Sequence, residues 1–232
     1  MTAKEDLFTP IHKALRSMLY HLSGRLQTHD FADVAATTAL MTDLETDFAI
    51  ARSAGCVLCV LHRHADDEET AIFGSVSPKN PGFVQALIEE HHELTRRELG
   101  ITKSGREILA MPTPEERVRA GVRLNQALND LLALYLAHMN REEVDLVPLM
   151  REHFTDAEMA GMRGRIMAGT PPERLAGVLG WMLPSLNVNE LSELLGGLTR
   201  GAPPELVKTV VGIASAKVDP ARWAAVRSRV GI

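Results

Sequence analysis

Apolar residues recur at intervals of three and four along most of the chain, the spacing that places side chains on one face of a helix. The first such stretch runs from about Thr9 to Gln27 and has Ile11, Leu15 and Met18 on one face. Pro10 stands at its first helical position, where a missing backbone N–H costs little. We therefore predict a helix over residues 9–27.

The same periodicity predicts three further long helices. In order, they cover about residues 33–73, 83–99 and 114–150. Gly55 marks a point where the second of these can bend, and the polar loop at 74–82 ends it. Thr113 and Glu116 have the spacing of a capping box, which fixes the start of the fourth helix.

After His153 the apolar residues fall into shorter groups, separated by signals for the start of a helix. These signals are the capping-box pairs Thr155/Glu158 and Thr170/Glu173, and Asp219 followed by Pro220. We expect four short helices between about residues 155 and 230. The predicted fold class is all-α, with a four-helix bundle over residues 1–154 and a C-terminal extension of short helices over residues 155–232.

Composition narrows the classes of function. The apolar fraction of 45% is enough for a buried core, and because only 4% of residues are aromatic, aliphatic side chains must fill it. A net charge of −5 argues against a nucleic-acid partner. No apolar run reaches the roughly 20 residues of a membrane span, so we expect no membrane partner and a cytoplasmic location. Cys56 and Cys59 are expected to be buried thiols, because no second pair completes a zinc site.

Two segments carry the same chemical pattern. One has His64 followed four residues later by Glu68, and the other has His138 followed four residues later by Glu142. Residues four apart lie one above the other on a helix, so each pair offers an imidazole and a carboxylate to one point. A carboxylate has two oxygens and can bridge two metal ions, whereas an imidazole nitrogen binds one.

The other two long helices each contribute a single inward-facing histidine. His12 shares a helix face with Leu15, and His91 shares one with Leu87 and Leu94, which favours it over the neighbouring His92. The order is then His, His-x-x-x-Glu, His, His-x-x-x-Glu, which implies a two-fold-like site in an antiparallel bundle. Four histidines and two glutamates suit a pair of borderline metals, iron above all.

Other interpretations of these residues exist. A single buried histidine is more often a satisfied core residue than a ligand, so the prediction depends on the matched set and not on any member. A purely structural bundle with fortuitous histidines is the alternative. Ferritin-type sites use Glu-x-x-His with more carboxylates, and nothing in the chain has that spacing in duplicate.

These residues resemble the hemerythrin-like (HHE cation-binding) family. The resemblance covers residues 7–153 and is carried by Ile11-His12-Lys13, His64-x-x-x-Glu68-Glu69, Glu90-His91 and His138-x-x-x-Glu142-Glu143 with Pro148. Residues 148–158 and 181–186 are similar to the region after the hemerythrin domains of BRUTUS-type plant iron-responsive proteins. The resemblance implies an up-and-down bundle around two iron ions with an oxo or hydroxo bridge. It implies terminal ligands at His12, His64, His91 and His138, and bridging ligands at Glu68 and Glu142.

One position departs from the family pattern. Oxygen-carrying hemerythrins have another histidine one turn after that on the third helix, and here the residue is Thr95. This argues against simple oxygen carriage and leaves one iron more open, or completed by His62, His92, Tyr135 or Glu69.

We therefore expect a di-iron protein that binds or senses oxygen, nitric oxide, peroxide or iron. The alternative is a di-iron enzyme, either an oxidase or a reductase of nitric oxide or peroxide. The C-terminal helices are a candidate surface for a protein partner.

Overall fold

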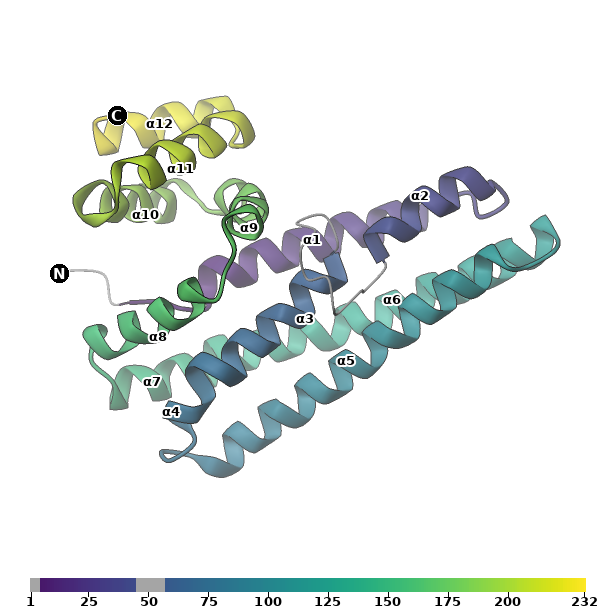
Figure 1. The fold of residues 1–232 in the computed structure, drawn as a ribbon, viewed down its shortest axis with the longest axis horizontal. Coiled ribbons are helices and arrows are strands. Elements are labelled where there is room, and N and C mark those ends of the chain that lie inside the picture. The colour runs from purple at the N-terminus through teal and green to yellow at the C-terminus, as the bar shows by residue number, and fades with distance from the viewer. Residues whose placement is uncertain (1–4, 45–56) are drawn as a thin grey trace.

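The computed structural model describes residues 5–44 and 57–232, and over these residues the chain is helical with no strand (Figure 1). The N-terminal helices are α1 (Thr9–Gln27), α2 (Val34–Leu44), α3 (Val57–Glu68) and α4 (Gly74–Val76). They are followed by α5 (Pro81–Leu109), α6 (Pro114–Arg141) and α7 (Val147–His153). The C-terminal helices are α8 (Asp156–Ala168), α9 (Pro172–Ser185), α10 (Val188–Gly201), α11 (Pro204–Lys217) and α12 (Pro220–Val230). Within the described residues, no helix is long and apolar enough to cross a membrane.

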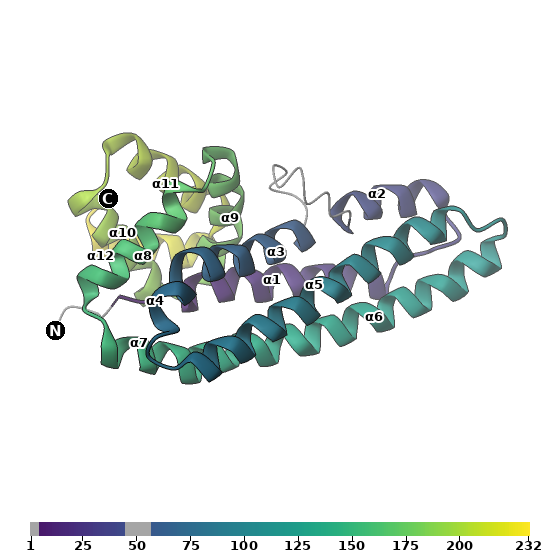
Figure 2. The same cartoon turned by 60° about the horizontal axis from the view of Figure 1, so that its bottom comes forward.

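Four helices pack as neighbours around a common core. Helix α1 contacts α3 and α6, and α5 contacts α3 and α6, so each of the four touches two others. Helix α2 lies against α5, away from the C-terminal helices (Figure 2). Helices α9 to α12 form a compact group beside α1, to which α9 makes the main contact.

The described core consists of three apolar clusters. Two of them lie within the four neighbouring helices, one built around Leu15, Leu61 and Leu94 and the other around Phe8 and Leu87. The third holds the C-terminal helices together through residues between 179 and 226. Met159 and Met162 of α8 pack into the second cluster, so α8 is continuous with the core of the long helices.

The helix predicted over residues 83–99, which corresponds to α5, was too short. The helix continues ten residues beyond the expected end at Leu99, to Leu109. Ile101 and Ile108 prolong its buried stripe against α2 and α6, and this packing outweighs the low helix propensity of Gly100. The predicted α1 and the capping box of α6 at Thr113 are confirmed.

The predicted helix over residues 33–73 is described as two helices, α2 and α3, and its middle, including Gly55, lies outside the described residues. The C-terminal region holds five short helices and not four. The capping boxes at Thr155 and the N-cap at Asp219 are confirmed. The prediction of a capping box at Thr170 is wrong, because the N-cap of α9 is Pro171.

Cys59 is buried as expected, but it is disulfide-bonded, so the prediction of a thiol there is wrong. Cys56 lies outside the described residues.

Candidate metal centre

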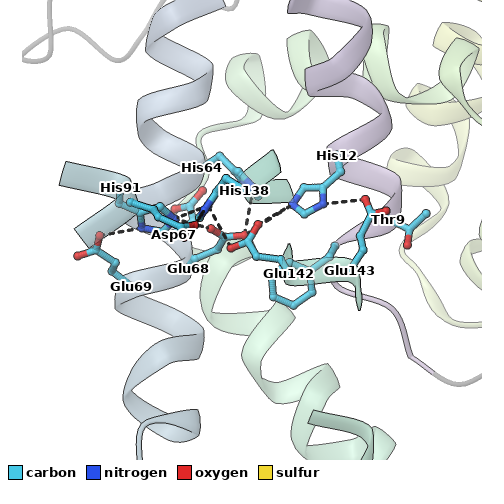
Figure 3. A network of polar contacts seen from close by, with 12 residues as sticks. Thr9, His12, His64, Asp67, Glu68, Glu69, His91, His138, Glu142 and Glu143 are labelled. Atoms are coloured by element: carbon cyan, nitrogen blue, oxygen red, sulfur yellow. Dashed lines mark hydrogen bonds and ion pairs between the residues drawn. The ribbon is translucent and has the colours of Figure 1, made fainter. Parts of the chain in front are cut away.

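The six residues chosen from the sequence come together in one buried layer (Figure 3). They are His12 from α1, His64 and Glu68 from α3, His91 from α5, and His138 with Glu142 from the end of α6. All six are at most 9% exposed. The layer forms because, along each helix, the polar residues of the six lie between residues of one apolar cluster and residues of the other.

Two helices show this register most simply. On α1, His12 lies between Phe8 of one cluster and Leu15 of the other. On α5, His91 lies in the same way between Leu87 and Leu94. Each polar residue thus takes a place in an otherwise apolar stripe, which directs it into the core.

The ligand atoms form two half-sites that share both carboxylates. The first half-site consists of His12 and His64 with Glu68 and Glu142, and the second of His91 and His138 with the same two glutamates. Within each half-site, one ligand atom per residue lies within 4.8 Å of all the others. This is the arrangement that two neighbouring metal ions require of a shared pair of carboxylates.

Each glutamate directs one oxygen toward each half-site. Oε1 of Glu68 lies 3.1 Å from Nε2 of His64, and Oε2 lies 3.3 Å from Nε2 of His91. Oε2 of Glu142 lies 3.3 Å from Nε2 of His12, and Oε1 lies 3.3 Å from Nε2 of His138. Both carboxylates are therefore oriented as bridges.

Most of the converging atoms have no hydrogen-bond partner. Nε2 of His12 and of His64, and all four carboxylate oxygens of Glu68 and Glu142, are buried without one. Such orphaned buried groups are costly unless something else binds them. Nε2 of His91 and Nε2 of His138 lie 2.9 Å apart, a separation that suits two nitrogens on one metal ion with bonds of about 2.0–2.1 Å.

Three of the histidines are bound at Nδ1, on the side away from the half-sites, by carboxylates that are not among the six residues; we call these the outer carboxylates. Nδ1 of His12 lies 2.9 Å from Glu143, Nδ1 of His91 lies 2.9 Å from Glu69, and Nδ1 of His138 lies 2.7 Å from Glu90. A carboxylate that accepts the Nδ1 proton leaves the Nε2 lone pair free for a metal ion and fixes the orientation of the ring.

Two of these outer carboxylates are themselves bound by arginine. Arg16 donates to Glu143 at 2.8 Å, and Arg141 donates to Glu90. These cations compensate the negative charge that the outer carboxylates bring close to the core. Phe73 stacks on the ring of His91 and excludes solvent from that side.

A π-helical turn begins at the end of each His-x-x-x-Glu pair, directly after Glu68 in one case and at Glu142 itself in the other. The turns cover Glu69–Phe73 and Glu142–Leu146. A π-turn adds a residue to the helical repeat and often occurs at functional sites. After each turn begins, Ile72 and Leu146 return to the apolar core.

Electrostatics couple these groups strongly. Burial lowers the pKa of His138, but the carboxylates of Glu142 and Glu90 raise it to about 10. Burial likewise acts to lower the pKa of His12, yet Glu142, Glu143 and Glu68 hold it well above its usual value. Burial raises the pKa of Glu68, and the histidines around it bring it well below its usual value. The imidazoles and carboxylates of the layer therefore favour each other's charged forms.

The residues considered as additional ligands lie elsewhere. Glu69 binds Nδ1 of His91, and His92 is exposed. Oγ1 of Thr95 lies 3.4 Å from Nδ1 of His62, and the Tyr135 hydroxyl donates to Glu98. Sequence reasoning missed Glu98, because a lone glutamate in a helix gives no signal that it is buried.

No protein-family model matches this chain, and neither a curated protein nor a solved structure matches it. The resemblance to hemerythrin-like proteins therefore stays a prediction from the motifs of the sequence. What the structure adds is that buried His and Glu groups able to hold a metal ion lie in the core of a helical protein.

Proposed function

We propose that this chain is a di-iron protein of the hemerythrin-like type that binds oxygen, nitric oxide or peroxide. The observation that carries the proposal is the pair of half-sites in which buried donor atoms converge, most of them without a hydrogen-bond partner. His12, His64, His91 and His138 would be terminal ligands, and Glu68 and Glu142 would bridge. In this proposal α1, α3, α5 and α6 form an up-and-down four-helix bundle.

The donor set favours iron among the available metals. Imidazole suits zinc, copper, iron and nickel, and a mixed set of histidine and carboxylate with open positions is typical of non-haem ferrous iron. Each half-site offers two imidazoles and one oxygen from each of two carboxylates. This leaves coordination positions at each ion, where a small exogenous ligand can bind.

The proposal is tested by loading the protein with ferrous iron in the absence of oxygen. We expect two iron ions per chain, one for each half-site, and a charge-transfer absorption band after exposure to oxygen. His64→Ala and Glu142→Ala should each lose metal. His92→Ala is the matched control, because His92 is exposed and should bind as the wild type does.

Two results would overturn the proposal. One is wild-type protein that retains fewer than two metal ions per chain after loading. The other is full metal content in the Glu142→Ala variant, which would favour a structural bundle with fortuitous histidines.

A further inference from the structure

A second buried polar cluster lies beyond the candidate metal centre, inside the apolar core. The Tyr135 hydroxyl on α6 donates to Oε1 of Glu98 on α5. Glu98 is 0% exposed and Tyr135 is 2% exposed. The pair belongs to neither half-site, and it is too deeply buried to serve as a surface contact.

Glu98 has a second oxygen without a hydrogen-bond partner. Oε2 is buried without a hydrogen-bond partner, and Nδ1 of His62 lies 3.7 Å from it. That distance exceeds a hydrogen bond, so a small rotation of the His62 ring is needed to close it. His62 is 25% exposed and lies 3.9 Å from Asp66, which is 49% exposed. The cluster therefore extends from the core toward solvent.

The cluster is also close to the candidate metal centre. Tyr135 lies three residues before His138, roughly 4.5 Å along α6. Glu98 lies two turns after His91 on α5, and the charge of His91 acts on its carboxyl. The charges of Glu68 and Glu142 act on the Tyr135 hydroxyl.

We propose that Glu98, held in place by Tyr135, supplies a proton to the reaction of the metal site with peroxide. This inference rests on the proposed function. Reduction of hydrogen peroxide breaks its O–O bond and consumes two electrons and two protons to give two water molecules. A reduced iron pair held by the six residues would supply the electrons, and Glu98 would give one proton and become a carboxylate. Solvent supplies the second proton and reprotonates Glu98 through the opening at His62.

The protonation state of Glu98 agrees with this role. Burial raises its pKa to about 8, although the hydrogen bond from Tyr135 and the charge of His91 act to lower it. The charged and titratable groups that act on it are Tyr135 from α6, His62 and Asp66 from α3, and His91 from its own helix. At neutral pH Glu98 therefore holds a proton that it can give up, as a general acid must.

The first test measures the proton directly and needs no bound iron. Infrared difference spectra between the wild type and Glu98→Gln, both metal-free, isolate the carbonyl stretch of the protonated Glu98 carboxyl. We expect this band to disappear with a midpoint near pH 8. In Tyr135→Phe the midpoint should move to higher pH, because the hydrogen bond that stabilises the carboxylate is lost. Tyr20→Phe, at an exposed tyrosine, should leave it unchanged.

The second test follows oxidation of the ferrous-loaded protein by hydrogen peroxide in a single turnover. Glu98→Gln should keep the wild-type iron content but react on the order of 100-fold more slowly at pH 7. The wild-type rate should fall above about pH 8, and the rate of the variant should be independent of pH in that range. Glu107→Gln is the control, because Glu107 is an exposed residue of α5 paired with Lys103.

Failure of this inference is distinct from failure of the proposed function. If the wild type binds iron and reacts with peroxide but Glu98→Gln has the same rate and pH profile, only the role of Glu98 is overturned. A Glu98 band that is absent at neutral pH would also overturn it. If the wild type binds no iron, the proposed function is overturned, and the role of Glu98 is overturned with it.

Discussion

At the scale of single residues, the candidate centre depends on carboxylates that belong to neither half-site but bind the histidines of the half-sites. Glu90 accepts from Nδ1 of His138 and is held by Arg141, so it sets both the orientation and the basicity of that imidazole. Removing its charge by Glu90→Gln should weaken metal affinity by about 10- to 100-fold, the usual effect of losing such a partner. Competition with a chromophoric chelator measures this loss.

The control for this prediction is Glu93→Gln on the same helix. The Glu93 carboxylate pairs with Arg96 and Arg97 and has no contact with a ligand histidine among the described residues. The affinity of the Glu93→Gln variant for metal should equal that of the wild type. Equal affinities for the Glu90 and Glu93 variants would contradict a role for the outer carboxylates.

Two glycines of the long helices allow a comparison between a tightly packed position and an open one. A Cβ at Gly121 would lie 2.1 Å from the ring of Phe31, whereas a Cβ at Gly100 would meet nothing within 4 Å. Gly121→Ala should therefore destabilise the protein by about 1–3 kcal/mol through overpacking. Gly100→Ala should stabilise it by up to about 1 kcal/mol, because alanine has the higher helix propensity. Urea unfolding measures both, and a stabilised Gly121→Ala would refute the steric argument.

The ligand-like residues were predictable from sequence, but their partners were not. The spacing of His64 and Glu68 predicts one shared face, because it depends only on the helical repeat. The contact between His12 and Glu143 joins residues 131 positions apart, and nothing local to either one indicates it. The same holds for Tyr135 and Glu98, which meet only because α5 and α6 are adjacent.

At the scale of helices, the start signals were more reliable than the end signals. The capping box at Thr113 depends on two residues three positions apart, so it is visible in the sequence and confirmed in the structure. The end of α5 depends on packing against α2, which the local sequence of Gly100 does not reveal. The π-turns were not predicted either, because the apolar pattern tolerates one extra residue without losing its face.

The C-terminal helices hold α3 through a buried ion pair. Nη2 of Arg174 on α9 donates to Asp67 at 2.8 Å, and Asp67 immediately precedes Glu68. Arg174→Ala should destabilise the protein by about 3 kcal/mol, the lower end of the range for breaking a buried pair, because Arg63 still binds Asp67 at 3.0 Å. Arg163→Ala should have little effect, since its pair with Glu5 is half-exposed.

Urea unfolding of both variants tests this prediction. Because Asp67 is adjacent to Glu68, which belongs to both half-sites, Arg174→Ala should also weaken metal binding, whereas Arg163→Ala should not. A wild-type unfolding free energy for Arg174→Ala would show that the two parts of the chain are held together by other contacts.

At the scale of the whole molecule, α1 connects the candidate centre to the C-terminal helices. His12 faces the centre, and the adjacent Lys13 pairs with Glu190 of α10 at 2.5 Å. One turn further, Ser17 bonds to Ser185 of α9. A shift of α1 when ligands bind would therefore act directly on α9 and α10. That these helices receive a protein partner stays a prediction.

The charge balance of the centre predicts how the stability of the metal-free protein depends on pH. The pKa of His138 is raised from 6.5 to about 10, so its stabilising contribution is complete below pH 6.5 and is lost as the pH rises toward 10. The pKa of Glu98 is raised to about 8, so ionisation of this buried carboxyl costs stability as the pH rises up to that value. Both effects have the same sign above neutrality.

We therefore expect the free energy of unfolding of the metal-free protein to fall steadily between about pH 6.5 and pH 10. Zinc should remove most of this dependence, because a ligand histidine bound to a metal ion is already neutral and no proton remains to be lost. Urea unfolding at several pH values, with zinc and with a chelator, provides the measurement. In Glu98→Gln the slope should become smaller in the lower part of the range and persist toward pH 10. A metal-free protein whose stability rises over this range would show that the histidines of the layer are neutral without metal.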